Sequence, residues 1–204
     1  MSKSVDKKPL PNFVKILPVL LIICGVIGMI MAFALTYDEL KLAANPNYIP
    51  SCNLNPIISC GSVMKSSQAH IFGFPNPIIG LAAFPVLLTS GVVMLSGAKL
   101  KRWYYVGLEI GAIGGIAMVT WLFFETVYHI HALCPYCMGT WIVTITSFIY
   151  ITMYNLQTGN IKLGKSKRLS NFLMRHHLDI LVLWFVIIAG LILKHFWYYY
   201  GHYF

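Results

Sequence analysis

The sequence predicts an all-α membrane protein with five transmembrane helices, and three observations support this prediction. Of the 204 residues, 58% are hydrophobic and only 10% are charged, with a mean hydropathy of +0.72. Soluble domains carry about 25% charged residues. Several apolar runs reach the roughly 20 residues needed to cross a bilayer. The lysines and arginines behind the net charge of +9 cluster beside these runs, which indicates membrane orientation and argues against nucleic-acid binding.

The first predicted span runs from Ile16 to Leu35, after a basic tail of residues 1–15. As a helix, this run would extend about 30 Å. A cleaved signal peptide ending near Ala32-Phe33-Ala34 is the alternative, but the run is longer than the usual apolar region of roughly 7–15 residues. We therefore expect the span to be retained, with Cys24 packed inside it as a small hydrophobic residue.

A polar loop of residues 36–77 follows, with turn signals such as Asn55-Pro56. Cys52 and Cys60 stand eight positions apart in this loop, where a disulfide would contribute about 2.5 kcal/mol of stability. Such a bond can act as a structural clamp or exchange with other thiols, and both readings stay open. Downstream, the stretch from Gly61 to Phe74 is typical of one short amphipathic helix at the membrane surface.

The second and third spans are predicted at Ile78–Ala98 and Tyr104–Phe124, with a short basic connection between them. A short connection makes the two helices antiparallel neighbours. Glu125 marks the end of the third span, at the membrane boundary, where a carboxylate is tolerated. The third span carries small residues that predict close helix–helix packing, at Gly107, Gly111, Gly114 and Gly115.

A connection of residues 126–133 leads to the fourth span, Cys134 to Tyr154, which opens with Cys134-Pro135-Tyr136-Cys137. Cysteines three residues apart share one helical face. We expect Cys134 to be the better thiolate, because unpaired N–H groups at a helix start stabilise negative charge. No metal site is expected, because His129 and His131 do not share a helical face and the cysteines lack a complete zinc-ligand spacing.

A basic linker of residues 155–179 precedes the fifth span in residues 180–204, which ends in an aromatic belt and a short outer tail. The three basic segments fall at alternate connections, so the positive-inside rule puts the N-terminus in the cytoplasm. Both cysteine pairs then lie on the extracytoplasmic face of a multi-pass cell-membrane protein, where disulfides persist.

Four thiols on one face predict an electron relay by thiol–disulfide exchange. The second pair borders the lipid, and the sequence carries no flavin or haem signature. A lipid-soluble quinone is therefore the predicted electron acceptor.

Three stretches, in order and at membrane boundaries, resemble the vitamin K epoxide reductase family in its prokaryotic form, over about Ile16 to Tyr154. The stretches are Cys52 to Ser67, Phe72-Gly73-Phe74-Pro75-Asn76-Pro77-Ile78-Ile79-Gly80, and Leu133-Cys134-Pro135-Tyr136-Cys137. The resemblance implies a four-helix bundle around a quinone pocket in residues 16–154, here with a fifth transmembrane helix added.

The resemblance also implies roles for the cysteines. Cys52 would take electrons from a reduced thioredoxin-like (DsbA-like) protein through a mixed disulfide, and Cys60 would resolve it and pass them to Cys134. Cys137 would then reduce the quinone, which could be ubiquinone, menaquinone or a related naphthoquinone. Because the sequence stops at Phe204 without a thioredoxin-like domain, we expect the partner to be a separate extracytoplasmic protein.

The same resemblance implies three quinone contacts. Ser66 and Asn76 match family positions near the quinone, where a developing negative oxygen needs a hydrogen-bond donor. A helix cap for Ser66 and a turn for Asn76 are the structural alternatives. Trp141 stands where animal members carry a tyrosine, so vitamin K epoxide reduction is in doubt, although an indole N–H also donates.

The predicted function is that of a membrane thiol oxidoreductase that reoxidises a thioredoxin-like partner, passes the electrons to a quinone and supports disulfide-bond formation. A vitamin K quinone or epoxide reductase is the first alternative. A non-enzymatic scaffold with a structural disulfide is the second, although it leaves the pair at Cys134 and Cys137 without a role. A soluble glutaredoxin-like enzyme shares Cys-Pro-Tyr-Cys but needs a preceding strand that this sequence does not predict.

Overall fold

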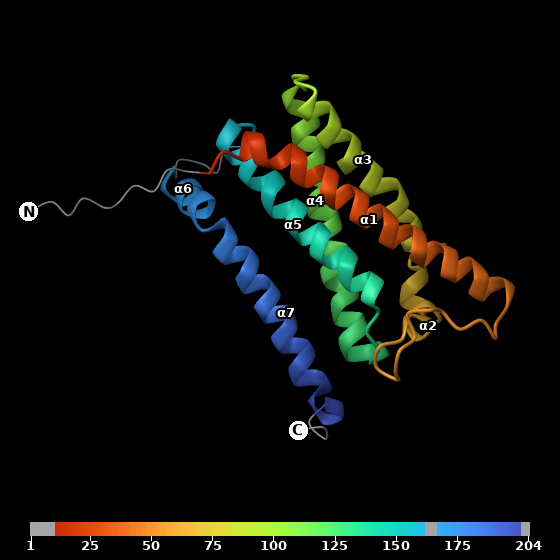
Figure 1. The fold of residues 1–204 in the computed structure, drawn as a ribbon. Coiled ribbons are helices and arrows are strands. Elements are labelled where there is room, and N and C mark those ends of the chain that lie inside the picture. Colours follow the sequence, from red (N-terminus) through yellow and green to blue (C-terminus); the bar gives the residue numbers. More distant parts are fainter. Residues whose placement is uncertain (1–10, 162–166, 201–204) are drawn as a thin grey trace, which may run out of the picture.

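Figure 1 shows a computed structural model of the chain, which describes residues 11–161 and 167–200. Five of its helices are long and apolar enough to cross a membrane, α4 and η2 together forming one of them, so the predicted all-α membrane fold is confirmed. The elements are α1 (Phe13–Ala44), α2 (Cys60–Met64), the 3-10 helix η1 (Ser67–His70), α3 (Pro77–Leu95), α4 (Arg102–Phe124), the π-helix η2 (Glu125–Ile130), α5 (Pro135–Thr158), α6 (Lys167–Arg175) and α7 (His177–Tyr200). The outer parts of the predicted tails, residues 1–10 and 201–204, and linker residues 162–166 lie outside the described residues.

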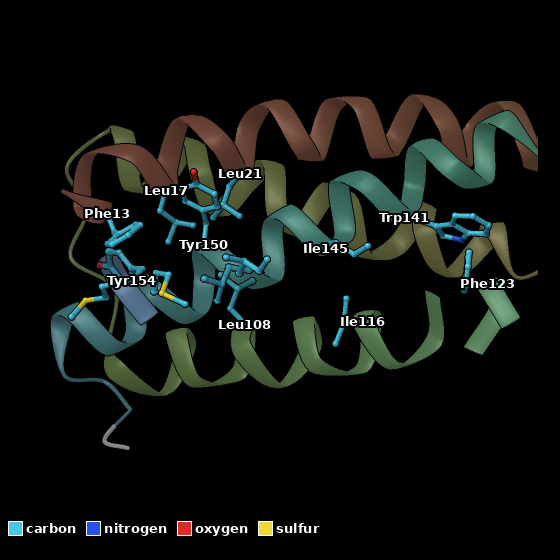
Figure 2. Packing of buried hydrophobic residues seen from close by; sticks show 14 of the residues in the cluster. Phe13, Leu17, Leu21, Leu108, Ile116, Phe123, Trp141, Ile145, Tyr150 and Tyr154 are labelled. Carbon is cyan, nitrogen blue, oxygen red and sulfur yellow. The ribbon is translucent and has the colours of Figure 1, made fainter. Parts of the chain in front are cut away.

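The four-helix bundle is built on α1 and α5. Helix α1 packs along both α3 and α5, and α4 packs along α5 (Figure 1). Side chains from α1, α4 and α5 meet in one core, where Phe13, Leu17, Leu108 and Tyr150 are buried (Figure 2). Helix α7 lies beside α5 and leaves most of its apolar side chains exposed, as expected for a helix in contact with lipid.

Glycines allow close packing between α1 and α3. The sequence had predicted such packing along α4 instead. A Cβ added at Gly91 would lie 2.6 Å from the carbonyl oxygen of Pro18, and one at Gly25 would lie 2.7 Å from the backbone nitrogen of Leu88. In contrast, a Cβ at Gly107 or Gly111 meets nothing within 4 Å. The packing prediction for α4 is therefore wrong at these positions. Small residues can bring helices together or leave a space, and only the neighbouring helix decides which.

Two helices continue beyond the predicted ends of their apolar runs. Helix α1 extends through nine residues of the predicted loop and ends at Ala44. The next residue, Asn45, precedes Pro46 and is extended, because a residue before proline disfavours the helical conformation. Helix α4 continues into η2 up to Ile130, so most of the predicted connection of residues 126–133 is helical. In both places the polar residues mark the end of the apolar run and not the end of the helix.

The predicted amphipathic helix from Gly61 to Phe74 is also wrong, because this stretch contains two shorter helices. Helix α2 ends at Met64 and η1 begins at Ser67, and between them Ser66 adopts an extended conformation with ψ of 151°. The predicted basic linker is also partly helical. Helix α5 continues into it as far as Thr158, and helix α6 lies within it. Helix α7 starts at His177, three residues before the predicted span.

The ends of the helices that carry the basic segments come together at one end of the bundle. Arg102 Nε donates a 2.8 Å hydrogen bond to the Asn160 carbonyl oxygen. The Gln157 side chain accepts a hydrogen bond from the Phe13 backbone N–H and donates one to the Pro11 carbonyl. Both cysteine pairs lie at the opposite end. The predicted grouping of charges and thiols on two separate faces therefore matches the fold.

Candidate functional site

A parallel β-bridge holds the two cysteine segments together. Ile58 pairs with Leu133, with hydrogen bonds of 2.6 Å from the Leu133 N–H to the Ile57 carbonyl and 2.9 Å from the Ser59 N–H to the Leu133 carbonyl. Cys60 follows this bridge on one side and Cys134 on the other. The loop and the start of α5 are thus fixed in register, with the bridge two residues before Cys60 and one residue before Cys134.

The loop cysteines form a disulfide, and asparagines organise the turn between them. Cys52 and Cys60 are joined, with their Cα atoms 5.7 Å apart. The Asn55 side chain accepts hydrogen bonds from the N–H groups of Ile57 and Ile58, as expected for an Asx turn before the bridge. Asn53 Oδ1 accepts a hydrogen bond of 2.9 Å from the Gly61 N–H, which ties the two ends of the loop together.

Cys134 occupies the N-cap position of α5, as the sequence predicted. Pro135 lies in the first turn, and the Cys137 N–H donates a hydrogen bond of 3.3 Å to Cys134 Sγ. Hydrogen bonds from the Cys137 thiol and from the backbone N–H groups of Tyr136 and Cys137 lower the pKa of the Cys134 thiol, and they outweigh burial, which acts in the opposite direction. Cys134 is therefore suited to react as a thiolate.

The two pairs lie in one small cluster of side chains. Cys52, Cys60 and Cys134 pack with Leu35 and Met64, and Cys137 packs against the same group. Cys60 and Cys134 are fully buried, whereas Cys52 keeps 6% of its surface exposed. Cys52 is therefore the most accessible of the three to a thiol from outside. Because its exposed surface is small, the loop must move before that thiol can attack it.

A cavity of about 550 Å³ extends from these cysteines into the bundle. Its lining includes six of the seven predicted site residues, namely Cys60, Cys134, Cys137, Ser66, Asn76 and Trp141. Cys52, the seventh, lies behind its disulfide partner and does not line the cavity. The surface of the cavity is otherwise almost entirely apolar.

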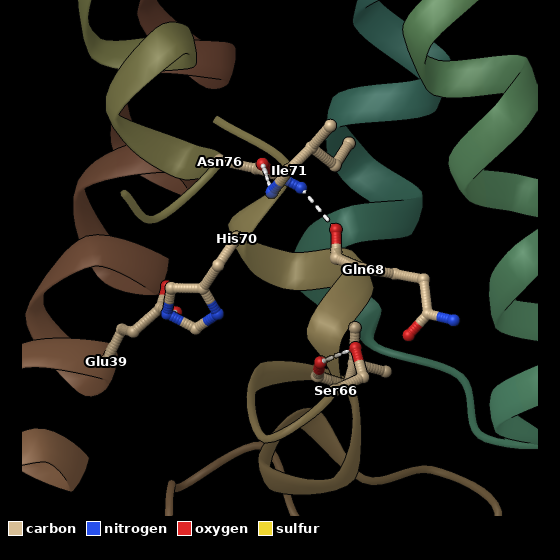
Figure 3. Close-up of polar contacts among 7 residues, drawn as sticks. Glu39, Ser66, Gln68, His70, Ile71 and Asn76 are labelled. Atoms are coloured by element: carbon tan, nitrogen blue, oxygen red, sulfur yellow. Dashed lines mark hydrogen bonds and ion pairs between the residues drawn. The ribbon is translucent and has the colours of Figure 1, made fainter. Parts of the chain in front are cut away.

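Ser66 and Asn76 both make local hydrogen bonds. Ser66 Oγ donates to the Val63 carbonyl at 2.6 Å and does not cap η1 through its side chain (Figure 3). Asn76 Nδ2 donates to the Gln68 carbonyl at 2.7 Å, and its Oδ1 accepts from the Ile71 N–H. These bonds hold the turn before α3, and one amide N–H of Asn76 is not used by them, because an amide group carries two.

Trp141 closes one side of the cavity. It is 4% exposed, and its ring packs edge-to-face against Phe123, with centroids 5.4 Å apart (Figure 2). This contact fixes the plane of the indole. The Trp141 position of α5 thus faces the cavity one turn after Cys137, as a helical spacing of four residues requires.

A family comparison matches residues 19–152 of this chain to the vitamin K epoxide reductase family. The match covers well over half of the sequence. This chain belongs to the vitamin K epoxide reductase family. A comparison with curated proteins finds no match.

As a member of this family, the protein is a membrane oxidoreductase of the general class that exchanges electrons between thiols or disulfides and quinones. The cavity fits a quinone, because ligand pockets are typically 300–1,000 Å³ and apolar with a few convergent polar groups. Ser66, Asn76 and Trp141 supply such groups, and Cys137 lies beside them. Within the described residues, no group of three or more His, Cys, Asp or Glu side chains is arranged to hold a metal ion.

Three glycines of α4 form part of the cavity wall. Gly107, Gly111 and Gly115 line it, so the missing side chains leave room along the helix. At Gly115 an added Cβ would come 3.3 Å from Thr144. The space that these glycines leave lengthens the cavity toward the end of the bundle that carries Arg102.

Two polar residues of the site were not predicted from the sequence, Glu39 and Gln68, and both line the cavity. One signal for Glu39 was present in the sequence. It lies four residues after Leu35, so the two share one face of α1 if the helix continues past the apolar run. Gln68 Nε2 donates a 3.2 Å hydrogen bond to Glu125, and that contact depends on the tertiary fold.

Proposed function

We propose that this protein oxidises the dithiol of a separate thioredoxin-like protein outside the cytoplasm and passes the electrons to a membrane quinone. The observation that carries the proposal is the shared cluster of both cysteine pairs at the mouth of one apolar cavity. The reoxidised thioredoxin-like partner would then introduce disulfides into other proteins.

The first step is thiol–disulfide exchange at Cys52. A thiolate of the partner attacks Cys52 Sγ, so that a mixed disulfide forms and the Cys52–Cys60 bond breaks, releasing Cys60 as a thiolate. The partial exposure of Cys52 and the complete burial of Cys60 support this order. The second partner thiol then resolves the mixed disulfide, so the partner leaves oxidised.

The second step transfers the electron pair to the fourth span. The Cys60 thiolate attacks Cys134 of an oxidised Cys134–Cys137 pair and releases Cys137, and Cys52 then attacks Cys60 and closes the loop disulfide again. This exchange leaves Cys134 and Cys137 reduced. The lowered pKa of Cys134 makes it a good leaving group, and the β-bridge at Leu133 keeps Cys60 beside it.

The third step returns Cys134 and Cys137 to the disulfide. A bound quinone supplies an acceptor for two electrons and two protons. Trp141 and Asn76 would orient it by hydrogen bonds to its oxygens. The Ser66 proton is already donated to the Val63 carbonyl, so Ser66 Oγ can only accept a hydrogen bond from an O–H of the quinol. The apolar lining keeps water away from the reacting sulfur atoms.

The orientation of the protein in the membrane is part of the proposal. The ends of α1, α4 and α5 that carry the basic segments meet, so a single assignment places them all in the cytoplasm. The cysteine end then faces the oxidising compartment, where a thioredoxin-like partner meets Cys52.

The test is a reconstituted reaction of the full-length protein with a reduced thioredoxin-like substrate and ubiquinone-1, menadione or vitamin K epoxide in turn. We expect quinol formation in step with thiol oxidation, and loss of both in Cys134→Ala. Cys24→Ala is the matched control, because Cys24 is buried and does not line the cavity, so the rate should stay unchanged. An unaffected Cys134→Ala variant would instead support a scaffold role, and turnover of the epoxide would support the alternative reductase.

A further inference from the structure

We propose that Glu39 and His70 form a proton relay between the outer water and the quinone cavity. This inference rests on the proposed function and adds two residues to it. The feature behind it is a buried carboxyl group in the cavity wall, with a half-exposed imidazole beside it (Figure 3).

The proposed reaction needs a path for protons. In each cycle two S–H bonds of the partner break, an S–S bond forms, two electrons pass to the quinone and two O–H bonds form on the quinol. Thiol–disulfide exchange moves thiolates and leaves their protons in the water outside. Because Cys60 and Cys134 are fully buried, these protons need another route to the cavity.

Glu39 stands where such a proton would be delivered. It lies one helical turn after Leu35, and both residues line the cavity. Glu39 is 5% exposed, and neither of its carboxyl oxygens receives a hydrogen bond from any described residue. Burying an ionised carboxylate without a donor is unfavourable, so this position favours the protonated acid, which can donate.

His70 connects Glu39 to water. Its Nε2 lies 2.9 Å from Glu39 Oε1, close enough for a proton to pass directly between the two side chains. The His70 side chain is 42% exposed. An imidazole accepts a proton at one nitrogen and releases it at the other, so it can pass protons from the outer surface to the carboxyl group.

Asn76 holds this arrangement in place. Its side chain donates to the Gln68 carbonyl at 2.7 Å (Figure 3). Its backbone N–H donates to the Ala69 carbonyl at 2.9 Å, and the two bonds fix η1, which ends at His70. Asn76 therefore has a positioning role in the relay, in addition to any contact with the quinone.

The other titratable groups near Glu39 fit this assignment. Cys137 is near enough to interact with it electrostatically, and Cys134 lies beside Cys137. The adjacent Asp38 accepts a 2.9 Å hydrogen bond from the Tyr48 hydroxyl and does not line the cavity. Glu125 is separated from the cavity by the Gln68 amide, which does not titrate.

Two half-reactions of the full-length protein in nanodiscs, quinone reduction and oxidation of the thiol substrate, distinguish the proton relay from the thiol exchange. Protein with reduced Cys134 and Cys137 is mixed with ubiquinone-1, and quinol formation is followed in a single turnover. We expect Glu39→Gln to slow this step by about 100-fold or more, the range of a lost general acid, and Glu39→Asp to recover part of the rate. Oxidation of a reduced thioredoxin-like substrate by the disulfide form of Glu39→Gln should keep the wild-type rate, which also shows that the variant is folded.

Glu125→Gln is the matched control, since it removes a nearby carboxyl group that does not line the cavity. His70→Ala should slow repeated turnover, and added imidazole should restore it. Wild-type rates in Glu39→Gln, or equal slowing of both half-reactions, would overturn the relay while leaving the proposed function intact. If the wild-type protein itself forms no quinol, the proposed function fails first.

Discussion

The backbone N–H of Leu133 donates a 2.6 Å hydrogen bond to the carbonyl oxygen of Ile57. This contact joins the loop of one cysteine pair to the chain just before the other. The proximity of the two pairs therefore depends on main-chain hydrogen bonds as well as on packing, and substitutions can test the two contributions separately.

Leu133→Pro should uncouple the two cysteine pairs, because proline lacks the N–H that bonds to Ile57. We expect the partner to form its mixed disulfide with Cys52 while quinol formation falls by at least about tenfold, the effect of one lost buried hydrogen bond. Trapping of mixed disulfides and quinone absorbance measure the two steps. Leu133→Ala keeps the N–H and is the control; a larger loss in Leu133→Ala than in Leu133→Pro would show that packing alone matters.

The pH dependence of the reaction should follow the thiolate of Cys134. Its pKa is lowered, mainly by the hydrogen bond from Cys137, so the thiolate persists below the ordinary thiol range and is lost as the pH falls through the lowered pKa. Cys137→Ala should therefore shift the titration upward. Thiolate absorbance near 240 nm, measured in a Cys24→Ala background, follows the titration of Cys134. An unshifted curve would show that the N–H groups at the start of α5 alone lower the pKa of Cys134.

The glycines of the bundle should differ in their tolerance of alanine. Gly91→Ala places a Cβ 2.6 Å from the Pro18 carbonyl oxygen and should destabilise the protein by about 1–3 kcal/mol through overpacking. Gly111→Ala meets nothing within 4 Å and should be neutral or stabilise the helix by up to about 1 kcal/mol. Thermal unfolding in detergent compares the two, and equal losses would contradict the assignment of close packing to α1 and α3.

Filling the cavity should weaken quinone use without affecting thiol exchange. Gly111→Leu adds a side chain at an open position of the cavity wall, so we expect the KM for a long-chain quinone to rise at least about fivefold, as for the loss of about 1 kcal/mol of apolar contact. Oxidation of the thioredoxin-like substrate in a single turnover is the internal control. If long-chain and short-chain quinones both keep their wild-type KM, the ligand does not occupy this part of the cavity.

Trp141→Phe tests the indole N–H. Phenylalanine keeps the aromatic contact with Phe123 but removes the donor, and a net hydrogen bond is worth about 0.5–1.5 kcal/mol. The KM for quinone should therefore rise by about two- to tenfold with unchanged folding. Steady-state kinetics with Phe123→Leu as the packing control separate the two effects; a loss in the control alone would assign Trp141 a packing role.

The sequence predicted the parts of the site that follow from local pattern. The position of Cys134 at a helix start came from Cys-Pro-Tyr-Cys at the edge of an apolar run, and the structure confirms it. The turn at Asn55-Pro56 is likewise local, and its side-chain hydrogen bonds agree with the prediction. In both cases the residues that determine the conformation are neighbours in the chain.

The predictions that failed depended on distant neighbours. The glycines of α4 looked like a packing surface, and only the absence of a nearby helix atom around Gly111 shows that they leave space. Glu39 looked like a loop residue because hydropathy falls after Leu35, and the contact with His70 from η1 shows that helix α1 continues beside the cavity.

By itself, the sequence determined the five membrane-spanning segments, the placement of Cys52 and Cys60 in a polar loop and the placement of Cys134 at a helix start, because hydropathy and helix-start chemistry act over a few neighbouring residues. The tertiary structure alone decided that Cys60 and Cys134 share one cluster and that Glu39 lines the cavity beside them. The physical reason is that a cavity is the space left between helices far apart in the chain, so its shape depends on how they pack and not on the pattern within any one of them.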